Sequence, residues 1–142
     1  MKPKTRLIAG LALAFLSSGA SAEWIEIDGF EDGTRVYVDR NTALRTGNDA
    51  EVFHLVRWGE PQIEPGQPAY LSTVVRTAYD CISKRERYLA STSYAGSLGN
   101  GAVVIADQDE AETWVSISDA SMEEKLWTIA CGTNGGTLDA RP

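Results

Sequence analysis

One short segment of the chain concentrates positive charge beside an aromatic ring. It contains Lys84, Arg85, Arg87 and Tyr88, in a protein of 142 residues with 20 acidic and 13 basic side chains. Ammonium and guanidinium groups donate charge-assisted hydrogen bonds to sulfate and carboxylate, so a strand carrying them could contact a sulfated sugar or an acidic protein surface. Protection of a sheet edge against pairing with another sheet is the alternative. These four residues are the predicted partner-binding site, with edge protection as the competing interpretation.

The other residues that could do chemistry do not form a catalytic or metal-binding set. His54 is the single histidine, and it stands in an apolar run with no second histidine or free cysteine to complete a site, so we predict a structural role. The acidic stretch lacks the sharp-turn glycine and distant glutamate of a calcium loop, and we interpret it as solvated. That stretch contains Asp107, Asp109, Glu110 and Glu112. We expect no catalytic residue, no metal and no cofactor.

The first 22 residues have the features of a cleaved signal peptide. Lys2, Lys4 and Arg6 precede an uncharged run of ten residues, 7–16, and the small residues Ala20 and Ala22 mark a cleavage site. A membrane-spanning helix needs about 20 apolar residues, so ten are too few. We predict cleavage after Ala22, no transmembrane segment, and a periplasmic or secreted protein.

Removal of the signal peptide makes the protein more acidic. It takes away three of the 13 basic residues and none of the 20 acidic ones, which leaves a formal charge of −10. A negative field of this size disfavours binding to nucleic acid or to anionic membranes. Contact with a polyanion would therefore need a local basic patch.

Two cysteines, Cys81 and Cys131, remain in the exported part of the chain. A pair of cysteines in an oxidising compartment most simply forms a disulfide. A redox pair would normally be Cys-x-x-Cys, and a zinc site needs ligands that one histidine cannot supply. We predict a structural disulfide between Cys81 and Cys131.

The mature chain has the pattern of several strands followed by one helix. Short runs rich in β-branched and aromatic residues predict strands, the first two of them joined as a hairpin. The predicted strands cover residues 24–27, 35–39, 51–58, 70–81, 85–94 and 103–105. Glycines between residues 96 and 101 suggest a phosphate loop, but no lysine and no helix follow, so a hairpin turn is the better interpretation.

A late amphipathic helix completes the predicted domain. Met122, Leu126, Ile129 and Ala130 recur at helical spacing over residues 119–131, and Ser121 precedes Glu124 by three positions, as in a capping box. We predict an α+β fold in which this helix packs on an antiparallel sheet of about six strands. We expect residues 23–132 to form one domain and residues 133–142 to form a flexible tail.

The order of several residues resembles the surface-adhesin protein E family of Gram-negative bacteria. The matching positions are Trp24, Val36-Tyr37-Val38-Asp39, Leu55-x-x-Trp58, Tyr70-x-Ser72, Tyr79-Asp80-Cys81, Tyr94, Trp114 and Cys131 at the end of the last helix. The resemblance covers nearly the whole mature domain. It implies an antiparallel sheet with a flanking helix, and contact with host extracellular-matrix or serum proteins through the segment of Lys84, Arg85 and Arg87.

The residues and the resemblance together predict a non-enzymatic binding or envelope-associated protein. The alternative is a small periplasmic enzyme or ligand-sensing domain that uses a pocket between sheet and helix. A pocket lined by converging polar groups would favour that alternative. The sequence alone assigns no oligomeric state.

Overall fold

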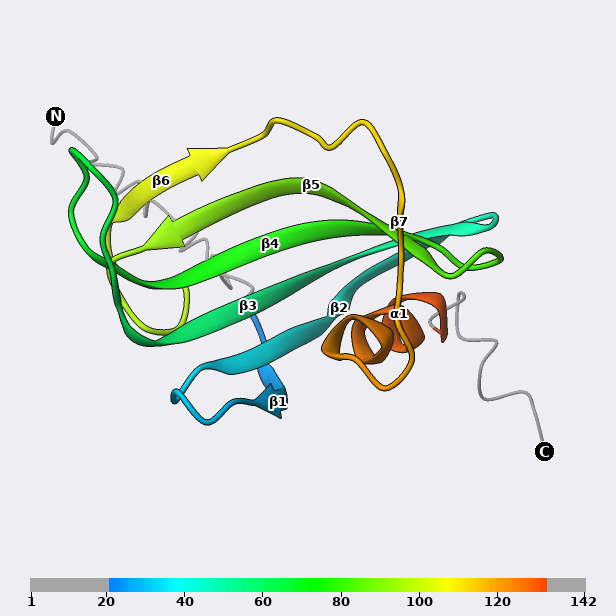
Figure 1. Ribbon diagram of the computed structural model, residues 1–142, viewed down its shortest axis with the longest axis horizontal. Helices are drawn as coiled ribbons and strands as arrows, with labels where there is room; N and C mark the ends of the chain where they lie inside the picture. The colour runs from blue at the N-terminus through cyan, green and yellow to red at the C-terminus, as the bar shows by residue number, and fades with distance from the viewer. Residues whose placement is uncertain (1–20, 133–142) are drawn as a thin grey trace, which may run out of the picture.

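The computed structural model describes residues 21–132, which form an antiparallel sheet and one helix (Figure 1). The elements in chain order are β1 (Ile25–Gly29), β2 (Arg35–Thr46), β3 (Asp49–Gln62), β4 (Tyr70–Asp80), β5 (Arg85–Tyr94), β6 (Val103–Asp107), β7 (Val115–Ser116) and α1 (Met122–Gly132). Strands β1 to β6 lie in the sheet in the order of the sequence, and β7 also pairs with β5. The predicted α+β class is confirmed.

The predicted signal peptide and tail are not covered by this description. Residues 1–20 and 133–142 lie outside the described part of the chain. Cleavage after Ala22, the domain bounds and a flexible tail therefore stay predictions.

The hairpin of β2 and β3 is longer than the sequence predicted. The two expected strands ended at Asp39 and began at Glu51, whereas β2 continues to Thr46 and β3 begins at Asp49. Gly47 has a φ of 62°, a conformation that glycine adopts without steric cost and that reverses the chain here. The register shifts between Asp39 and Leu44, so β2 is irregular where the predicted strand stopped.

The helix α1 packs on one face of the sheet, which we call the helix face. It begins after Ser121, whose Oγ accepts a hydrogen bond from the backbone N–H of Glu124 at 3.1 Å, as an N-cap residue does. Helix and sheet meet in a core of buried side chains: Val38, Ala50, Val52, Tyr79, Ile117, Leu126 and Ala130. Removing this apolar surface from water is the main contribution to the stability of the domain.

The predicted disulfide is present and joins the sheet to the helix. Cys81 follows β4 and is bonded to Cys131 in the last turn of α1. Two further contacts support the junction: Trp127 Nε1 donates to the carbonyl of Asp80 at 3.1 Å, and Arg45 Nη1 donates to the carbonyl of Cys131 at 2.5 Å. The end of the helix is thereby fixed to the tips of both long hairpins.

Among the described residues 21–132, no helix packs on the other face of the sheet, and we call it the open face. Side chains alternate along each strand, so Phe53 and Val74 point to the open face while Val52 and Val75 point toward the helix. After β6 the chain runs along β5, pairs with it through β7, and then reaches α1 on the helix face (Figure 1). The open face is therefore the face of the sheet on which side chains can contact a binding partner.

Candidate functional site

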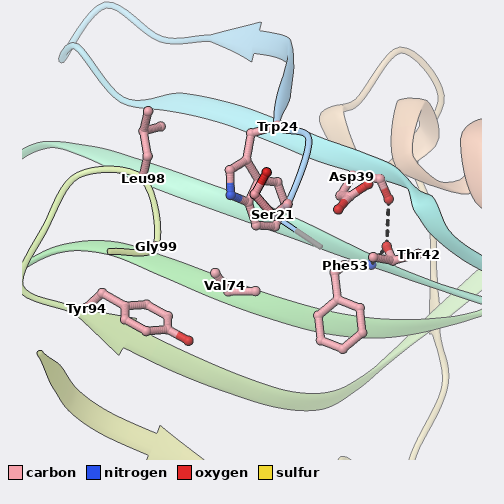
Figure 2. Close-up of a pocket in the computed structure, with 10 residues that line it drawn as sticks. Ser21, Trp24, Asp39, Thr42, Phe53, Val74, Tyr94, Leu98 and Gly99 are labelled. Carbon is pink, nitrogen blue, oxygen red and sulfur yellow. Dashed lines mark hydrogen bonds between the residues drawn. The ribbon is translucent and has the colours of Figure 1, made fainter. Parts of the chain in front are cut away.

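A groove of about 470 Å³ lies on the open face, and its walls are mostly apolar and aromatic. Figure 2 shows Phe53 and Val74 on neighbouring strands, Tyr94 on β5, and Trp24 just before β1. The lining residues are Ser21, Ala22, Trp24, Asp39, Thr42, Phe53, Val74, Tyr94, Leu98 and Gly99. Aromatic and apolar walls with a few polar groups are typical of ligand and partner sites.

The loop between β5 and β6 forms one wall of the groove. Ser72, which is fully buried, donates to the carbonyl of Gly96 at 2.6 Å and accepts from the N–H of Gly99 at 2.9 Å. Gly99 has a φ of 69°, and a Cβ there would stand 3.3 Å from both Leu55 Cδ1 and Val74 Cγ2. Glycine at this position therefore lets the loop lie directly on the sheet. The predicted hairpin turn is confirmed, since β5 and β6 are antiparallel neighbours.

The opposite end of the groove is polar. Asp39 is only 5% exposed, and its Oδ1 accepts the N–H of Asn41 at 3.0 Å. The hydroxyl of Thr42 donates to the carbonyl of Asp39 and accepts from the N–H of Phe53. These bonds satisfy the backbone where β2 is irregular. They also fix the position of Phe53, which is 37% exposed.

Two of the predicted partner-binding residues, Arg85 and Arg87, lie on the open face beyond the groove. Their guanidinium groups lie over the ring of Trp114, at 5.8 and 5.3 Å from its centroid. Arg85 forms an ion pair with Asp80 at 2.7 Å, and this contact lowers the pKa of Asp80 to about 2. Arg87 Nη1 donates to the carbonyl of Ala111 at 3.2 Å. The two arginines thus attach the segment before β7 to the sheet.

The other two predicted residues, Lys84 and Tyr88, do not share this face. Lys84 lies in the turn before β5 and pairs with Asp119 and Glu124, which raise its pKa. The hydroxyl of Tyr88 donates to Asp107 at 2.5 Å, and its pKa is raised by burial and by this contact. The structure therefore separates the predicted cluster. Arg85 and Arg87 share the open face, whereas Lys84 contacts the start of α1 and Tyr88 contacts the end of β6.

A second, smaller cavity of about 200 Å³ lies between the sheet and the first turn of α1. His54 lines it and is 7% exposed, with burial lowering its pKa to about 4. The remaining lining residues are Val75, Thr77, Glu86, Tyr88, Met122, Glu123 and Leu126. Residues 21–132 contain no group of three or more histidine, cysteine or acidic side chains that could hold a metal ion.

Comparison with known proteins identifies the family. A family model described as surface-adhesin protein E matches residues 24–132. The chain belongs to the surface-adhesin protein E family. The match spans all eight elements of the fold, with Trp114, both cysteines and every lining residue of the groove except Ser21 and Ala22. No curated protein sequence matches the chain.

Solved structures of Haemophilus influenzae protein E have the same fold. One has a TM-score of 0.61 at 12% identity, covering 100% of this chain and 96% of the other. The selenomethionine form has a TM-score of 0.60 at 13% identity, covering 96% and 97%. A structure from a non-typeable strain has a TM-score of 0.58 at 11% identity, covering 83% and 90%. At these identities the likeness shows the shared fold.

The groove was not predicted from the sequence, although some of its residues were noted. Trp24 and Tyr94 carry the family resemblance without a predicted role in a site. Phe53 and Val74 could have indicated the site, because they are an aromatic residue and a valine at strand positions that face solvent and would ordinarily carry polar side chains.

Within residues 21–132, no helix has the length and apolar character that crossing a membrane requires.

Proposed function

We propose that this protein is an exported, non-enzymatic adhesin that binds host extracellular-matrix or serum proteins through the open face of its sheet. The observation that carries the proposal is the groove of about 470 Å³ on the uncovered face of a domain that belongs to an adhesin family. An exposed apolar patch framed by polar residues is a common feature of interaction sites. Cleavage after Ala22 and a periplasmic, secreted or surface location are part of this proposal.

The partner would contact both ends of the open face. Phe53 and Leu98 expose 37% and 41% of their surface at the groove and would supply apolar contact area. Arg85 and Arg87 already use part of their hydrogen-bonding capacity within the chain, but a guanidinium has five N–H donors. Their remaining donors would pair with carboxylates of an acidic partner. Lys84 and Tyr88 would support this contact by fixing the adjoining turn and β5.

The test is binding of the mature protein to immobilised vitronectin, laminin and heparin, measured at low and at physiological salt. Phe53→Ala and Tyr94→Ala should weaken binding at both salt concentrations, because apolar contacts are little affected by screening. A double variant with Arg85→Gln and Arg87→Gln should weaken binding mainly at low salt. Glutamine avoids the repulsion that glutamate would create beside Asp80 and Glu110.

Two substitutions outside the open-face site serve as matched controls. Ile63→Ala removes an apolar side chain that is 77% exposed on the loop after β3, and Arg40→Gln removes an exposed arginine of β2. Neither should change binding. If the wild type binds none of the three surfaces, or if the groove variants bind as well as the controls, the proposal is wrong.

A further inference from the structure

The N-terminal end of the described chain lies in the groove on the open face. Ser21 and Ala22, the last two residues of the predicted signal peptide, line the groove together with Trp24 (Figure 2). Glu23 follows them, and its backbone nitrogen is anchored to the carboxylate of Asp39, another lining residue. The predicted cleavage site therefore lies on the folded domain, beside the proposed binding site.

Asp39 is a buried carboxylate without a positively charged partner in the uncut chain. The residue is 5% exposed, and its carboxylate accepts hydrogen bonds from the backbone nitrogens of Glu23 and Asn41, which are both neutral amides. No lysine or arginine of residues 21–132 forms an ion pair with it. Burying a carboxylate is costly unless a cation compensates its charge, so this position calls for one.

Hydrolysis of the peptide bond between Ala22 and Glu23 supplies that cation. The oxygen of one water molecule becomes part of the new carboxylate of Ala22, and its two protons convert the amide nitrogen of Glu23 into an ammonium group. An α-amino group has an ordinary pKa of about 8, so it is largely charged at neutral pH. Because this nitrogen already lies beside Asp39, the ion pair forms where the hydrogen bond was.

We propose that Asp39 is the receptor for the mature N-terminus, and that cleavage after Ala22 thereby switches the groove from covered to open. This inference rests on the proposed adhesin function and on the predicted cleavage site. Cleavage removes two residues that line the groove and so widens it on the side of Trp24. The new ion pair fixes Trp24, which is the next residue after the ammonium group, as a wall of the groove. The uncut chain therefore binds a partner weakly, and the mature chain binds it fully.

The receptor role of Asp39 can be tested without a partner, on the mature chain that starts at Glu23. NMR titration should show the pKa of the Glu23 α-amino group about half a unit or more higher in the wild type than in Asp39→Asn, because a nearby opposite charge favours the ammonium form. Asp49→Asn changes an exposed carboxylate of β3 and should leave that pKa unchanged. Equal pKa values in the wild type and in Asp39→Asn overturn the receptor role.

A matched chain that starts at Ser21 tests the covering of the groove. Nuclear Overhauser effects should connect the methyl group of Ala22 to lining side chains such as Phe53 and Val74, and their absence refutes the covering. On any of the three immobilised surfaces that binds the mature chain, the longer chain should bind about fivefold more weakly, since apparent affinity falls with the fraction of open grooves. Equal binding overturns the switch. If no surface binds the mature chain, the adhesin function fails, whereas the titration and the Overhauser contacts still decide the roles of Asp39 and Ala22.

Discussion

The backbone nitrogen of Glu23 lies 3.3 Å from Oδ2 of Asp39, a carboxylate that is buried beside the groove. The side chain of Glu23 is held as well, since its Oε2 accepts a hydrogen bond from Asn41 Nδ2 at 3.2 Å. In the precursor this nitrogen is an amide. If cleavage follows Ala22, it becomes the N-terminal ammonium group, and the hydrogen bond to Asp39 becomes an ion pair. Cleavage also removes Ser21 and Ala22, which line the groove.

The ion pair predicts that the free N-terminus stabilises the mature protein. Acetylation of Glu23 should lower the free energy of unfolding by about 1 to 2 kcal/mol, since hydrogen bonds between charged groups contribute more than neutral ones. The measurement is urea denaturation at pH 7 of free and acetylated protein, each with Asp39 intact and with Asp39→Asn. In the Asp39→Asn background acetylation should have little effect. An equal loss in both backgrounds would show that no such pair forms.

Reduction of the disulfide should weaken the domain strongly. Cys81 and Cys131 are 50 residues apart, and closing a loop of that length stabilises a protein by about 4 kcal/mol in the chain-entropy model. A double variant with Cys81→Ala and Cys131→Ala should therefore unfold at a much lower denaturant concentration than the oxidised wild type. Thiol labelling of the unreduced, denatured wild type should find no free cysteine. Labelling of both would contradict the bond.

The stacking of Arg85 and Arg87 on Trp114 predicts that Trp114 holds the segment before β7 against the sheet. Trp114→Ala should cost about 1 to 2 kcal/mol, because it removes two cation–π contacts and apolar packing on the open face. Hydrogen exchange should accelerate at Ala111, whose N–H donates to the carbonyl of Tyr88, and at neighbouring residues before β7. Arg40→Ala, on an exposed part of β2, is the control. Unchanged exchange at Ala111 would mean that backbone pairing alone holds the segment.

Burial of His54 predicts that the domain loses stability in mild acid. An unfolded histidine takes up a proton near pH 6.5, whereas His54 in the folded protein does so only near pH 4. Between these values the unfolded state binds more protons, so the free energy of unfolding should fall by roughly 3 kcal/mol as the pH decreases from 6.5 to 4.

Glu86 should act in the opposite direction over part of this range. Because its pKa is raised in the folded protein, protonation of Glu86 favours folding as the pH falls. The two contributions can be separated by measuring unfolding against pH in His54→Gln and in Glu86→Gln. His54→Gln should flatten the acid side of the profile, and Glu86→Gln should steepen it. A profile of His54→Gln identical to that of the wild type would rule out the histidine as the cause.

Much of the fold could be predicted because local pattern and tertiary packing agree. The helical spacing of Leu126 and Ala130 indicates which side of α1 is buried. The extension of β2 past Asp39 could not be predicted, because residues 40–46 are mostly polar and become a strand only by pairing with β3. The expected helix over residues 119–131 is observed at 122–132, where Ser121 caps its first turn.

The candidate sites depended on contacts between segments far apart in the sequence. The basic residues are adjacent in the sequence, but contacts with Trp114 and Asp119 place Arg85 and Lys84 in different parts of the structure. Trp114 and Asp119 lie about 30 residues later along the chain. The groove exists because the loop containing Gly99 folds onto β3 and β4. His54 was predicted to be structural, and it is buried, yet its position at a cavity depends on where the helix begins.

The position of α1 at the end of the described chain has a consequence for biogenesis. A polypeptide emerges from the ribosome, or from an export channel, with its N-terminus first, so the strands appear before the helix that covers them. Until Leu126 and Ala130 arrive, the side chains of Val38, Val52 and Tyr79 have no cover on the helix face. During that interval the uncovered apolar side chains of the sheet can associate with any other apolar surface. A chaperone that binds this face would protect the chain until Cys131 emerges and the disulfide forms.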